Sequence, residues 1–251
     1  MPPWPVFVGV GAVLGSLSGL FGVGGSSLAT PLLSVLGVPG LMAVASPLPA
    51  TVPTAVTAAW PYVRRRNVRP RAALWSLVGA VPASVIGALL AHLIGGGPLL
   101  IASGVALVAV GVRVLRPVSD RAHRVGEARR RDRPMLVAAS AGVGLFTGLL
   151  ANGGGFLLVP MFLLVFGLTM LEAAGTSLAV VAALAIPTTA MHGALGHIDW
   201  SVAGALAIGA TPASAVTALW AQHKNARRMQ AAFAWFLIVS GAAFILYRLV
   251  A

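Results

Sequence analysis

The chain has 251 residues, of which 58% are hydrophobic and 9% are charged, and its net charge is +12. Soluble domains carry about 25% charged residues, so this composition excludes an ordinary soluble domain. Apolar runs of about 18–23 residues separate the charges, and a helix of that length crosses a hydrocarbon core of about 30 Å. The runs lack the period-two alternation of barrel strands. The predicted fold class is therefore an all-α polytopic membrane protein.

The predicted helices form two sets of five. The first set covers residues 6–21, 26–36, 41–62, 72–94 and 99–115, and the second covers residues 135–150, 155–166, 171–192, 200–222 and 229–250. Polar, arginine-rich residues lie between the sets. We therefore divide the chain into a first transmembrane repeat (1–115), a basic cytoplasmic linker (116–134) and a second transmembrane repeat (135–251).

The two sets repeat one motif. Gly15, Gly19, Gly24-Gly25 and Pro31 recur 129 residues later, at Gly144, Gly148, Gly153-Gly154 and Pro160. Further along, the offset becomes 130, as in Ala43/Ala173, Leu48/Leu178 and Gly79/Gly209. Two copies of a hydrophobic unit are typical of transporters, whose binding site lies where the repeats meet.

The second helix of each set is too short to span a membrane, because twelve helical residues rise only about 18 Å. A glycine cluster precedes each one. We therefore expect each repeat to open with a broken, re-entrant helix hairpin that returns to its starting side, followed by three transmembrane helices. Three crossings after a returning hairpin make the second repeat inverted relative to the first.

The positive charges give an orientation. Thirteen of the seventeen Lys and Arg residues fall within 64–71 and 113–133, and such clusters mark cytoplasmic loops and attract anionic lipid headgroups. The inverted arrangement places sixteen of the seventeen inside, whereas parallel repeats place fourteen inside. Both chain termini are then expected outside. The charge does not indicate nucleic-acid binding, because no module for it is present.

Functional groups are sparse. Cysteine is absent, which excludes disulfides and thiolate metal sites, and we expect no cofactor or metal. All five acidic residues lie at or beyond helix ends, so neither a catalytic carboxylate pair nor a mid-membrane cation site can be assembled. The chain is not expected to be an enzyme. His92, His192 and His197 are open to proton coupling or to interfacial anchoring.

The glycine breaks suit an anion. The first turn of a helix presents unpaired N–H groups and a partial positive charge, and glycine allows close approach to the backbone. The alternative is that the glycines only permit helix packing, which we expect for Gly11, Gly15 and Gly19. Hydroxyls that open the next helix can contact cargo or bond back to the helix. The candidate substrate-binding residues are Gly24, Gly25, Ser26, Ser27, Ser46, Asn152, Gly153, Gly154, Gly155, Thr176 and Ser177.

These motifs resemble the sulfite exporter TauE/SafE family, also called the toluene sulfonate uptake permeases. The resemblance rests on Gly19-Leu-Phe-Gly-Val-Gly-Gly-Ser-Ser with Pro31, on Gly148-Leu-Leu-Ala-Asn-Gly-Gly-Gly with Pro160, on 174–178 and on 196–200. It implies a multi-pass carrier of sulfur-containing anions in a bacterial inner membrane. This chain departs from the family at Ser26, where a third glycine is frequent, and at Ser46-Pro47, where Thr-Ser is usual. The two halves of the site are therefore expected to be unequal.

The sequence thus predicts a secondary transporter that moves sulfite, thiosulfate or an organosulfonate by alternating access around a midplane site. A carrier of another small anion such as a carboxylate, a passive anion channel, and a membrane-embedded enzyme are the alternatives. Expected partners are the anionic substrate and membrane lipids, and a homodimer is compatible with the sequence.

Overall fold

A computed structural model describes residues 3–24, 26–94, 96–115, 132–149 and 155–250, and all regular structure in these ranges is helical. The first half contains α1 (Trp4–Phe21), α2 (Ser26–Val35), α3 (Gly40–Ala45), α4 (Pro47–Arg64), α5 (Pro70–Ile94) and α6 (Gly96–Leu115). The second half contains α8 (Arg133–Leu149), α9 (Gly155–Pro160), the π-helix η1 (Met161–Val165), α10 (Met170–Ala194), α11 (Trp200–Ala221) and α12 (Ala226–Val250). The all-helical prediction is confirmed. Within the described residues α1, α10 and α11 are long and apolar enough to cross a membrane.

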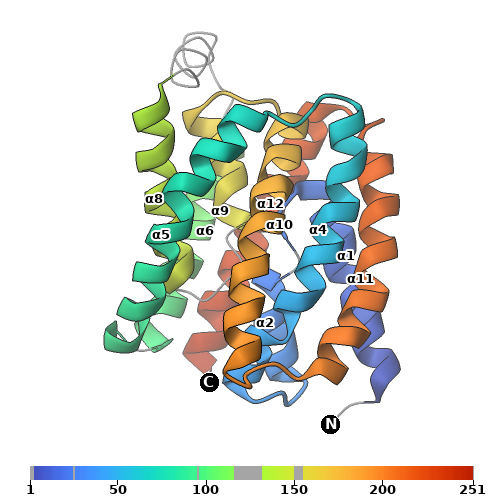
Figure 1. Cartoon of the computed structure of the whole chain (residues 1–251), viewed down its shortest axis with the longest axis vertical. Coiled ribbons are helices and arrows are strands. Elements are labelled where there is room, and N and C mark those ends of the chain that lie inside the picture. The colour runs from blue at the N-terminus through green and yellow to red at the C-terminus, as the bar shows by residue number, and fades with distance from the viewer. Residues whose placement is uncertain (1–2, 25, 95, 116–131, 150–154, 251) are drawn as a thin grey trace.

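The helices form an elongated bundle with two distinct ends (Figure 1). One end, here called the terminal end, holds the start of α1, the end of α12 and the α10–α11 connection. The other, here called the basic end, holds the start of α8 and the connections α4–α5 and α11–α12. Those two connections carry Arg65, Arg66, Arg69 and Lys224. The first helices of the two halves therefore start at opposite ends of the bundle.

Equivalent positions of the two halves make equivalent contacts, in which each half packs a helix against a helix of the other half. A Cβ on Gly15 of α1 would lie 2.6 Å from the Ala210 Cα of α11, and a Cβ on Gly144 of α8 would lie 2.7 Å from the Ala80 Cα of α5. Gly15 and Gly144 differ by 129 residues, and Ala80 and Ala210 by 130. Helix α1 thus packs along α11 as α8 packs along α5, and the packing interpretation of Gly15 is confirmed.

One predicted helix is divided. The sequence predicts a single helix over 41–62, whereas the structure has α3 and α4 joined at Ser46. Pro47 and Pro49 follow directly, and a proline lacks the N–H that an uninterrupted helix needs. The equivalent helix of the second half, α10, has Ser177 in place of Pro47 and runs unbroken from Met170 to Ala194.

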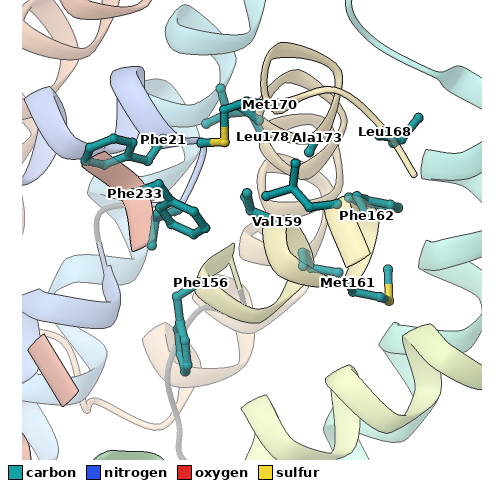
Figure 2. Packing of buried hydrophobic residues seen from close by; sticks show 14 of the residues in the cluster. Phe21, Phe156, Val159, Met161, Phe162, Leu168, Met170, Ala173, Leu178 and Phe233 are labelled. Atoms are coloured by element: carbon teal, nitrogen blue, oxygen red, sulfur yellow. The ribbon is translucent and has the colours of Figure 1, made fainter. Parts of the chain in front are cut away.

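A buried apolar cluster lies beside the end of α1. The Phe21 ring contacts those of Phe233 and Phe236, with centroid distances of 5.5 and 5.4 Å. Figure 2 shows Phe233 between Phe21 and Val159 of α9, with Phe162 of η1 on the far side of Val159. The cluster joins α1, α12 and the α9–η1 segment, and so fixes the position at which the first helix is interrupted.

Candidate functional site at the two helix breaks

The first break follows α1. Gly22 and Gly24 have φ angles of 74° and 71°, a left-handed conformation that glycine adopts without steric cost. The N–H of Gly22 still bonds to the Ser18 carbonyl at 2.8 Å and so caps α1. Both glycines are buried against α10, because a Cβ would lie 2.5 Å from Ala174 Cα at Gly22 and 2.8 Å from Val181 Cγ1 at Gly24. Helix α2 begins at Ser26.

The second break meets the first. Gly155 is the first residue of α9 and is buried. A Cβ on Gly155 would overlap the carbonyl group of Val23 and would lie 3.0 Å from the Gly24 nitrogen. Only glycine can come this close to another backbone. The interrupted segments of the two halves are therefore in direct backbone contact inside the bundle.

Ser177 of α10 also reaches this contact. Its buried hydroxyl donates to the Gly155 carbonyl at 3.4 Å. Because a hydroxyl has lone pairs as well as one proton, Ser177 can hold the chain at Gly155 and keep its acceptor capacity. Thus Gly24, Gly155 and Ser177 are the predicted site residues that the structure brings together.

The surroundings of the breaks contain no fixed charge. Every charged residue in the described ranges lies in a connection or in an end turn of a helix. Val23, Phe156 and Val181 are buried next to the breaks. Among the described residues, the donors available there are backbone N–H groups, because the one proton of the Ser177 hydroxyl is donated to Gly155, and no carboxylate competes for them. Such donors suit an anion, which they can bind without a permanent counter-charge.

Ser46 and Thr176 lie on either side of the breaks. Ser46 Oγ accepts from the Asp199 N–H at 3.0 Å toward the terminal end, and Thr176 Oγ1 accepts from the Arg69 N–H at 3.1 Å toward the basic end. Both side chains are fully buried. Ser46 and Thr176 do not contact each other. Their contact with cargo stays a prediction.

The remaining predicted residues fall partly outside the structure's description. Gly25, Asn152, Gly153 and Gly154 lie outside the described residues. Ser26 and Ser27 form the first turn of α2, but their side chains lie outside the described residues. Their roles stay predictions.

Two residues that sequence reasoning did not select contact the predicted ones, and a third contacts one of those two. Arg69 and Asp199 supply the N–H groups just described, and Glu172 forms an ion pair with Arg69. The signal available in the sequence was the repeat itself, since Arg69 and Asp199 are 130 residues apart, like Ser46 and Thr176.

No described histidine side chain is a hydrogen-bond partner of the breaks, and the His92 side chain lies outside the described residues. His192 and His197 contact each other, Nδ1 to Nδ1, at 3.4 Å near the α10–α11 connection. Within the described residues no group of three or more His, Asp or Glu side chains could hold a metal ion.

Comparisons with known proteins identify the family of the chain. The family model described as "Sulfite exporter TauE/SafE" matches residues 7–244. The chain is 29% identical to a "Probable membrane transporter protein" of Xylella fastidiosa strain 9a5c, over 97% of this chain and 95% of that protein. It is 24% identical to the "Probable membrane transporter protein" YunE of Bacillus subtilis, over 82% and 84% of the two chains.

A second Bacillus subtilis relative, the "Probable membrane transporter protein" YjnA, is 24% identical over 94% of this chain and 97% of that protein. No solved structure matches the chain. Because the family model covers nearly all of the sequence, the chain belongs to the TauE/SafE family of membrane transporters.

Proposed function

We propose that this protein is a secondary transporter that moves small sulfur-containing oxyanions, such as sulfite, thiosulfate or an organosulfonate, by alternating access. The observation that carries the proposal is the backbone contact between Gly155 and Val23–Gly24. It joins the two interrupted helices inside a bundle whose described helix interiors hold no charged side chain. A site of this kind favours a negative cargo.

Helix direction supports the same cargo. From the breaks, α2 leads to the terminal end and α9 with η1 leads to the basic end (Figure 1). Their first turns therefore start near one another, and each first turn offers unpaired N–H groups and the positive end of the helix dipole. Two opposed half-helices of this kind are a recurrent way to hold an anionic group in membrane transporters.

The exchanged contacts of the two halves support inverted repeats. Alternating access then follows from two equivalent arrangements of one repeat against the other. With the basic end in the cytoplasm, both termini of this inner-membrane, multi-pass protein lie outside. Three tryptophans stack with cations at the basic end, in the pairs Arg64–Trp60, Arg133–Trp75 and Lys224–Trp220. Such pairs belong at the headgroup level and would contact anionic lipids.

Counterflow in proteoliposomes tests the proposal. Vesicles loaded with unlabelled sulfite should accumulate external radiolabelled sulfite transiently, and the rate should saturate with concentration. Thiosulfate and sulfoacetate should compete, and acetate should not. An empty-vesicle preparation is the control for binding to lipid.

Other outcomes select the alternatives. Competition by acetate as strong as by thiosulfate would assign the same scaffold to carboxylates. Flux that does not saturate and shows no counterflow would indicate a passive channel. Alkaline phosphatase fused to either terminus should be active if that terminus lies outside, and inactive fusions would overturn the orientation.

A further inference from the structure

Two hydrogen bonds of this structure join equivalent positions of the two halves. The Asp199 N–H donates to Ser46 Oγ at 3.0 Å, and the Arg69 N–H donates to Thr176 Oγ1 at 3.1 Å. Ser46 and Thr176 are 130 residues apart, and so are Arg69 and Asp199. Each bond joins a hydroxyl of one half to the residue that precedes a long helix of the other half, α11 or α5.

The acceptor side of each bond is shielded from water. Ser46 and Thr176 are 0% exposed, so neither hydroxyl oxygen can exchange its partner for solvent while the ends are packed. A buried hydroxyl left without its partner costs more than the net gain from an average hydrogen bond. Each bond therefore breaks only together with the packing around it, when the two halves separate at that end.

The two ends differ in what reinforces the bond. Arg69 donates from Nε to Glu172 Oε1 at 2.9 Å, and Glu172 also closes the capping box of α10 with Thr169. At the terminal end the Asp199 carboxylate caps its own helix through the N–H groups of Ser201 and Val202. The position equivalent to Glu172 is Met42. Among the described residues, only the basic end adds an ion pair.

The basic end is also linked to the breaks. Thr176 is followed by Ser177, which donates to Gly155. Ser46 is followed by Pro47, which has no hydroxyl to donate. Separation at Thr176 would therefore move the residue that contacts the second break, whereas the terminal end has no equivalent bond.

We propose that the Thr176–Arg69 and Ser46–Asp199 bonds are the two latches of the transport cycle, which release alternately, and that the basic-end latch with Glu172 is the stronger. Ser46, Thr176 and Glu172 are positioning residues in this scheme. The proposal rests on the proposed alternating access, but it does not depend on which anion is carried.

The absence of cysteine from the sequence makes the test direct. Ala43 and Ala173 are equivalent positions, and both are 0% exposed. Ala43 lies in α3 toward the terminal end, and Ala173 lies in the first turn of α10 toward the basic end. Ala43→Cys and Ala173→Cys give single thiols that report opening of each end. In detergent-solubilised protein a polar maleimide reaches both ends, so its labelling rate does not depend on membrane orientation.

Loosening one latch should shift the two reporters in opposite directions. Thr176→Val, which removes the acceptor but keeps the shape, should raise labelling of the Ala173→Cys thiol and lower that of the Ala43→Cys thiol. Ser46→Ala should do the reverse. A hydrogen bond contributes a net of about 0.5–1.5 kcal/mol, which corresponds to a change of roughly twofold to tenfold in the ratio of the two rates. Thr176→Ser keeps the hydroxyl and should leave the ratio near that of wild type.

Glu172→Gln tests the ranking of the ends. Glutamine still completes a capping box, so this variant removes the charge pair while the helix start is retained. It should shift labelling toward the Ala173→Cys thiol, as Thr176→Val does. An unchanged ratio would overturn the assignment of the stronger latch to the basic end.

Parallel behaviour of the two reporters would overturn the latches themselves. If Thr176→Val and Ser46→Ala raise or lower both labelling rates together, the bonds only support the fold. The experiments distinguish failure of the latches from failure of the proposed cargo. Opposite labelling shifts without counterflow of any tested anion would support the latches and rule out transport of sulfur-containing anions.

Discussion

At the centre of the bundle, Gly155 meets Val23 and Gly24 through backbone atoms, whereas on either side Ser46 and Thr176 hold the opposite half through buried hydroxyls. The central contact depends on shape, because no side chain larger than hydrogen fits between the two chains. The flanking contacts depend on hydrogen bonds. Among the described residues, only the contact at the basic end is accompanied by an ion pair. A transporter needs both: a centre that stays assembled, and ends whose bonds can be broken and remade.

Gly155→Ala should have the largest effect. The new methyl group would overlap the Val23 carbonyl, and backbone cannot give way as a flexible side chain can. We expect loss of transport and a stability loss of about 1–3 kcal/mol or more, measured by counterflow and by unfolding in mixed micelles. Gly142→Ala is the matched control, since a Cβ there has no atom within 4 Å. Normal flux in Gly155→Ala would refute a functional contact between the breaks.

The exchanged helix contacts predict equal effects in the two halves. Gly15→Ala and Gly144→Ala would each press a methyl group against the backbone of the paired helix, at Ala210 and Ala80. Each should lower the free energy of unfolding by about 1–3 kcal/mol. Gly9→Ala, where a Cβ finds open space, should be neutral or stabilising. A large loss for one glycine and none for the other would break the equivalence of the halves.

Ser177→Ala separates cargo binding from packing. The hydroxyl bond to Gly155 is long, at 3.4 Å, so its loss should change stability little. If the Ser177 hydroxyl turns its proton from Gly155 to the anion, loss of the hydroxyl should raise KM roughly tenfold, because hydrogen bonds to charged groups are the stronger ones. Ser140→Ala is the control, as Ser140 is a buried serine whose hydroxyl contacts Met161 Sδ at 3.7 Å instead. An unchanged KM in Ser177→Ala would limit Ser177 to a structural role.

Sequence patterns predicted most helices because apolar runs, glycine clusters and prolines mark them locally. They also placed Gly24 and Gly155 in one candidate site, since the repeat puts both at equivalent breaks. They did not predict the division at Ser46, because a proline can either kink a helix or end it. The bonds to Arg69 and Asp199 join residues 107 and 153 apart. Such contacts depend on how the halves pack, which no local pattern encodes.

Asp199 provides a smaller test at the terminal end. Its carboxylate accepts from the N–H groups of Ser201 and Val202 at 2.9 and 3.2 Å. Asp199→Ala should therefore cost about 1 kcal/mol in unfolding free energy, and Asp199→Asn almost nothing, because asparagine caps helices equally well. The bond to Ser46 uses the backbone N–H and survives in both variants. Equal losses would show that the charge of Asp199, and not its cap, stabilises this end.

The smallest expected effect is the Arg69–Glu172 coupling. The Arg69 side chain is 49% exposed and that of Glu172 is 13% exposed, so solvent screens the pair. A double-mutant cycle with Arg69→Gln and Glu172→Gln should give about 0.3–1 kcal/mol at low salt and less at high salt. A coupling energy near zero would leave the Asn67–Gln222 and Arg65–Gln222 bonds as the difference between the ends. The basic end would then be held by bonds that pair no opposite charges, and its opening would depend little on ionic strength.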